Sequence, residues 1–91
     1  MINLVLYTRR GCCLCEGLEE KLLALDPPPS LRLMDVDRDP QLQARFGLEV
    51  PVLVAVTPAG LKQLPRVSPR LEGRQLADWL AGQLAAGGAG E

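Results

Sequence analysis

The hydrophobic positions of the chain fall into short runs and periodic stripes that are separated by loop residues. Two apolar runs, at 2–7 and 31–36, predict two buried strands. Between them, leucines recur every three or four residues from Leu14 to Leu25, which is the spacing of one face of an amphipathic helix. This part of the chain therefore predicts a strand–helix–strand unit whose two strands run parallel.

The middle of the chain predicts a second helix followed by two more strands. Asp39 and Pro40 are residue types that favour the N-cap and the first position of a helix, so a short helix is predicted over 40–46. The apolar run 50–56 predicts a third strand, and 61–64 predicts a short antiparallel partner for it.

The last apolar stripe, which includes Trp79 and Leu80, predicts a helix from about residue 71 to residue 85. The glycine- and alanine-rich residues 87–91 are expected to form a flexible tail, which leaves 1–86 as one domain. The order of elements is β-α-β-α-β-β-α. The expected fold class is therefore α/β, with a four-stranded mixed sheet and helices on both of its faces.

Composition narrows the functional classes. The chain has 91 residues, of which 47% are hydrophobic and 23% charged, as in an ordinary globular domain. Its net charge of −1 favours neither nucleic acid nor a membrane surface as a partner. No apolar stretch approaches the roughly 18–20 residues that span a bilayer, and the first residues lack the features of a signal peptide. We therefore expect a cytoplasmic protein. Separately, we expect it to be a monomer.

All three cysteines lie within the segment from Cys12 to Cys15, between the first predicted strand and the first predicted helix. A secreted scaffold would distribute an even number of cysteines along the chain, so this cluster indicates chemistry rather than cross-linking. Cys12 and Cys15 are one helical turn apart. The helix N-terminus, together with Arg9 and Arg10, favours the thiolate of Cys12. We therefore expect Cys12 to be the nucleophile and Cys15 the buried resolving thiol.

Cys13 should leave the helix in another direction, so we interpret it as a bystander or as a secondary thiol open to glutathionylation. Two alternatives to redox chemistry remain. A structural zinc site needs four ligands and the chain has no histidine, so a metal or iron–sulfur carrier would need a second chain or small thiols to complete its site. Otherwise the cysteines are small core residues of a binding module without this chemistry.

The stretch from Tyr7 to Cys15, with Val50-Pro51 after a β-α-β gap, resembles glutaredoxins. It is more similar still to a small glutaredoxin-like family with a Gly-Cys-x-Leu-Cys centre. The acidic stretch from Asp35 to Pro40 is similar to that family too, and the resemblance extends from about residue 2 to residue 84. It implies a thioredoxin fold and a thiol–disulfide oxidoreductase with a dithiol mechanism.

The resemblance also implies roles for individual residues. Pro51 would be a cis-proline that faces the cysteine pair, and Val50 would present its backbone to glutathione or to an extended peptide. Arg9 would contact a carboxylate of glutathione. Without the resemblance, a solvated loop arginine is an equally good interpretation of this residue. Glutathione would be a co-substrate, with no permanently bound cofactor and no metal. The partners would be protein or low-molecular-weight disulfides.

The chain departs from the usual glutaredoxin pattern at two places. Cys13 and Leu14 stand where glutaredoxins have Pro and Tyr. The segment Val67–Gly73 replaces the Gly-Gly-x-Asp stretch that helps glutaredoxins to hold glutathione, although Arg70 within it could pair with a carboxylate.

Overall fold

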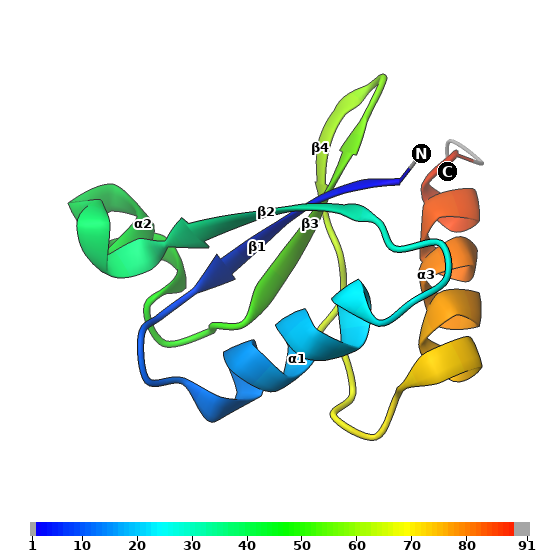
Figure 1. Cartoon of the computed structure of the whole chain (residues 1–91). Coiled ribbons are helices and arrows are strands. Elements are labelled where there is room, and N and C mark those ends of the chain that lie inside the picture. Colours follow the sequence, from blue (N-terminus) through cyan, green and yellow to red (C-terminus); the bar gives the residue numbers. More distant parts are fainter. Residues whose placement is uncertain (1, 89–91) are drawn as a thin grey trace.

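The chain alternates strands and helices in the predicted order (Figure 1). The structure is a computed structural model, and it describes residues 2–88. Its elements are β1 (Asn3–Thr8), α1 (Cys13–Leu23), β2 (Ser30–Asp35), the 3-10 helix η1 (Val36–Arg38), α2 (Pro40–Phe46), β3 (Val52–Thr57), β4 (Gly60–Gln63) and α3 (Gly73–Gly88). Within the described residues, no helix has both the length and the hydropathy needed to cross a membrane.

The strands form one mixed sheet with the order β2-β1-β3-β4. β1 pairs in parallel with β2, as predicted for the strand–helix–strand unit, and antiparallel with β3. β4 pairs antiparallel with β3, which confirms the predicted partner strand. β1 and β3 are thus the two inner strands, and the cysteine cluster follows β1 after a short loop.

Apolar side chains cover both faces of this sheet, as the alternation along its strands requires. On one face, leucines of β1 pack with leucines of α1 and α3, including Leu22, Leu76 and Leu80. On the other face, Phe46 of α2 packs with Val52 and Val54 of β3, and its ring lies 4.7 Å from the ring of Tyr7. Figure 1 shows α2 lying apart from α1 and α3. The prediction of helices on both faces is confirmed.

Most strand boundaries differ from those predicted by one residue, and those of β3 and α3 differ by more. β3 begins at Val52 rather than Val50, because Pro51 has no N–H to donate and the N–H of Val50 donates to the Phe46 carbonyl oxygen (3.1 Å). α3 begins at Gly73 and continues to Gly88, past the predicted end at residue 85. Of the expected flexible tail, residues 89–91 lie outside the described part of the chain.

Candidate thiol site

Cys12 is the N-cap of α1, one position before the helix begins. Its backbone is extended (φ −90°, ψ 108°), and its Sγ accepts a hydrogen bond from the backbone N–H of Cys15 at 3.2 Å. A sulfur atom here takes the place of the side-chain oxygen that usually caps a helix. Cys12 is partly buried, and the predicted position of this thiol at the helix start is observed.

Cys15 lies one turn further on and is only 1% exposed. Burial raises the pKa of its thiol, and hydrogen bonding with Cys12 raises this pKa further. Hydrogen bonds from the Thr8 side chain and the Arg9 backbone lower the Cys15 pKa, but burial has the larger effect. Both thiols are free, so this structure contains one partly accessible thiol with a protected second thiol beside it.

Cys13 is exposed and lines a cavity of about 100 Å³ next to α1. Leu14, which is 53% exposed, and Pro51 line the same cavity. Its charged lining residues are Lys21 and Arg66, both basic. The cavity brings the residues between Cys12 and Cys15, and the proline that sequence analysis singled out, to one surface.

The Val50–Pro51 peptide bond is cis, which confirms the geometry that the family resemblance implied. Base rates for proline would have favoured trans, so this feature did not follow from the residues alone. The N–H of Val50 is engaged by Phe46, as described above, and is not free for docking in this structure. The docking role of Val50 and Pro51 stays a prediction.

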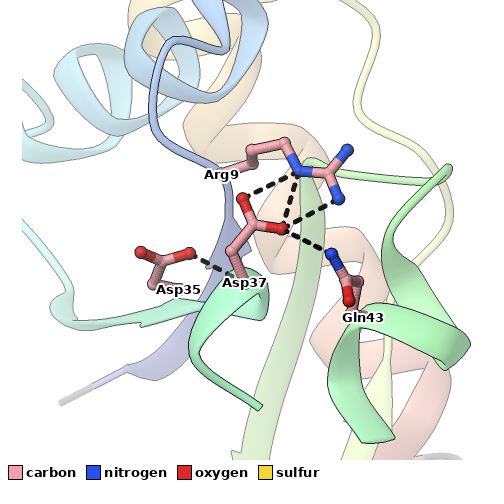
Figure 2. Close-up of polar contacts among 4 residues, drawn as sticks. All are labelled: Arg9, Asp35, Asp37 and Gln43. Carbon is pink, nitrogen blue, oxygen red and sulfur yellow. Dashed lines mark hydrogen bonds and ion pairs between the residues drawn. The ribbon is translucent and has the colours of Figure 1, made fainter. Parts of the chain in front are cut away.

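Arg9 forms an ion pair that sequence analysis missed (Figure 2). Its Nη2 lies 2.9 Å from Oδ1 of Asp37, and its Nε lies within hydrogen-bond distance of both carboxylate oxygens. This hydrogen bonding raises the pKa of Arg9 above its ordinary value. The positive charge expected near Cys12 is therefore paired with a carboxylate, and Arg10 is the exposed arginine of the loop.

The short helix η1 presents Asp37 to Arg9. The backbone N–H of Asp37 donates to Oδ1 of Asp35 at 2.9 Å, which caps this helix. Such a turn, in which an aspartate binds the backbone two residues later, is a known local preference. The Asp35-x-Asp37 spacing was the available signal, but nothing local to it indicates Arg9 as the partner.

The three cysteines do not form a metal site within one chain. Across the described residues, no three side chains of His, Cys, Asp or Glu are grouped closely enough to hold an ion. Cys13 is directed to the surface, whereas Cys15 is buried, which is why three neighbouring cysteines do not converge. A carrier function would need ligands beyond those that the described residues bring together.

The mixed sheet flanked by helices, with a Cys-x-x-Cys pair at a helix start and a cis-proline, defines a protein of the thioredoxin-like class. The chain belongs to the family described as Glutaredoxin-like domain (DUF836), whose family model matches residues 3–81.

Two solved structures support this class. A Northeast Structural Genomics target protein from X. campestris is 31% identical, with a TM-score of 0.60 over 87% of this chain and 96% of that chain. A malarial protein of 13% identity shares the fold, with a TM-score of 0.58 over 92% of this chain and 98% of that chain. No curated protein matches the chain.

Proposed function

We propose that this protein is a glutaredoxin-like thiol–disulfide oxidoreductase that uses Cys12 as nucleophile and Cys15 as resolving thiol. The observation that carries the proposal is the arrangement of this pair. The Cys12 sulfur is partly exposed and accepts the Cys15 N–H at the positive end of α1, whereas the Cys15 thiol is buried one turn below. A helix N-terminus and a donated N–H favour negative charge on sulfur, and the thiolate is the reactive form.

In the first step, the Cys12 thiolate attacks one sulfur of a substrate disulfide. A disulfide forms between Cys12 and that sulfur, and the substrate's own disulfide breaks. The departing thiolate takes a proton from water. The partial exposure of Cys12 at the N-cap suits this bimolecular step, because this residue lies outside the buried core.

In the second step, Cys15 loses its proton and attacks Sγ of Cys12. The bond between Cys12 and the substrate breaks, and the second substrate thiolate leaves and is protonated. The substrate has then gained two electrons and two protons, and the protein holds a Cys12–Cys15 disulfide. Two molecules of glutathione, or one molecule of a dithiol, would reduce this disulfide, become oxidised to a disulfide themselves and complete the cycle.

The cavity beside α1 offers a place for the rest of the substrate. Leu14 and Pro51 supply its apolar surface close to the cysteines, and Lys21 and Arg66 supply positive charge. Glutathione or an extended peptide that carries a disulfide would lie along Pro51. Lys21 also donates to the Pro69 carbonyl oxygen at 2.6 Å, which ties this wall of the cavity to α1.

Cysteine variants test the proposal with a neutral disulfide and with glutathione disulfide as substrates. Cys12→Ser is expected to abolish turnover with both. Cys15→Ser should complete only the first step and accumulate a mixed disulfide, visible as an added mass on the intact protein. Cys13→Ser is the matched control, since it removes a neighbouring thiol but neither working one. Wild-type turnover by Cys12→Ser would overturn the proposal.

A further inference from the structure

Arg9 lies in the loop before α1, and its side chain connects this loop to η1 and, through Asp37, to α2. We propose that Arg9 is a positioning residue for Cys12 and Cys15, held in place by Asp37 and Gln43, rather than a ligand for a substrate carboxylate. The inference rests on the proposed function, because it names what orients that pair.

The side chain of Arg9 is held at several points. Three of its contacts to Asp37 lie between 2.9 and 3.2 Å, in the fork geometry that a guanidinium makes with a carboxylate. The same carboxylate accepts from Nε2 of Gln43 in α2 at 3.1 Å. Asp37 is thus fixed by η1 through its backbone and by α2 through its side chain, as Figure 2 shows.

The backbone of Arg9 reaches both working cysteines. Its carbonyl oxygen accepts the N–H of Cys12 at 3.2 Å, which closes the turn before α1. The Arg9 backbone also lowers the pKa of the Cys15 thiol, against the larger effect of burial. A shift of the Arg9 backbone would therefore move the N-cap sulfur and the environment of the resolving thiol together.

α2 also holds Asp37, the partner of Arg9, in place, and a short turn connects α2 to the cis-proline. Gly47 at its end is buried, and a Cβ there would meet the Gln43 carbonyl oxygen and approach Nη2 of Arg9 to 3.4 Å. The guanidinium therefore packs against the turn that precedes Val50-Pro51. The two sides of the proposed site are held to one another through Arg9.

This pairing also bears on substrate binding. A guanidinium already engaged by Asp37 would have to break that pair before it could bind a substrate carboxylate. The two roles predict different kinetics, because a carboxylate ligand affects only substrates that carry a carboxylate. A positioning residue affects every disulfide equally.

The experiment uses the full chain in a Cys13→Ser background. Arg9→Lys keeps the charge but loses the fork, Asp37→Asn removes the carboxylate, and Asp78→Asn is the control. Asp78 is an exposed aspartate of α3 that pairs with Arg74 at 4.0 Å, so its variant removes the same charge elsewhere. The readouts are kcat and KM with a neutral disulfide, bis(hydroxyethyl) disulfide, and with glutathione disulfide, each with dithiothreitol, which has no carboxylate, as the reductant. Equilibration in a glutathione buffer gives the equilibrium constant for formation of the Cys12–Cys15 disulfide.

We expect Arg9→Lys and Asp37→Asn each to lower this equilibrium constant by roughly two- to fivefold, the range for one partly exposed ion pair. Their kcat should fall by a similar factor on both substrates while KM stays constant, and Asp78→Asn should match its parent. An unchanged equilibrium constant, or a rise in KM confined to glutathione disulfide, would overturn the inference. If Asp37→Asn does not fold, Gln43→Ala removes one hydrogen bond to the same carboxylate, and the same criteria apply.

Failure of the proposed function would look different. If the parent protein turned over neither disulfide, the oxidoreductase proposal would fail while positioning could still be measured. The rate at which iodoacetamide alkylates Cys12 reports its placement without any turnover. Arg9→Lys should slow this reaction roughly two- to fivefold, and an unchanged rate would count against positioning.

Discussion

The burial of Cys15 makes the second step of the proposed reaction depend on pH. An ordinary cysteine has a pKa of about 8.5, so about 3% of it is thiolate at pH 7. Burial raises the Cys15 pKa, so its thiolate fraction at pH 7 is smaller still. Below the pKa this fraction grows tenfold for each pH unit. The resolving step should therefore accelerate about tenfold between pH 7 and pH 8, and should continue to accelerate beyond pH 8.5.

Part of the increase in the Cys15 pKa will persist in the mixed-disulfide intermediate. Once Cys12 is in a mixed disulfide, the effect of its thiol on Cys15 is removed, but burial, the largest cause, remains. The Cys15 pKa is therefore raised in the resolving step as well. A raised pKa keeps the neutral thiol to higher pH, so alkaline conditions favour attack and neutral conditions slow it.

Dithiobis(nitrobenzoate) separates the two steps in a Cys13→Ser background. Attack by Cys12 releases one coloured thionitrobenzoate, and attack by Cys15 on the resulting mixed disulfide releases the second. The rate of the second release, followed by stopped-flow absorbance, is expected to rise as described. Thr8→Val is a companion variant. It removes a hydrogen bond that lowers the Cys15 pKa, so it should slow the second phase further at a given pH.

Two results would refute this reasoning. A second phase that levels off below pH 8.5 would show that the resolving thiol is not held in its neutral form by burial. A second phase that persists in Cys15→Ser would assign the step to another group.

Three further predictions concern stability and metal content. Leu22→Ala truncates a fully buried leucine and should lower the free energy of unfolding by about 2–5 kcal/mol, and Tm by at least about 8 °C in thermal denaturation. Leu23→Ala, at a 51% exposed neighbour, is the control, and equal losses would contradict the burial argument. Gly11→Ala should lower the free energy of unfolding by about 1–2 kcal/mol, because Gly11 has φ +79°. Gly17→Ala should raise the free energy of unfolding by up to about 1 kcal/mol in the same assay, because an added Cβ there meets no other atom and alanine favours a helix. Anaerobically purified protein should be colourless and free of metal by elemental analysis. A coloured dimer would instead favour an iron–sulfur carrier.

The sequence by itself determined the sequential framework of the fold. The leucine spacing between residues 14 and 25 required a helix with one apolar face, and apolar runs on both sides of it required strands. The Cys-x-x-Cys pair fell at their junction, so one accessible thiol and one buried thiol could be predicted from one helical turn. These features depend on residues within a few positions of one another, and local periodicity is enough to place them.

The tertiary structure decided which distant residues meet. Arg9 and Asp37 are 28 residues apart, and they pair only because the parallel β1 and β2 end at the same edge of the sheet. The cis geometry of Val50–Pro51 likewise did not follow from the residues around it. Local spacing carries no information about such contacts. The cysteine pair could therefore be read from the chain, but the ion pair that holds its loop could not.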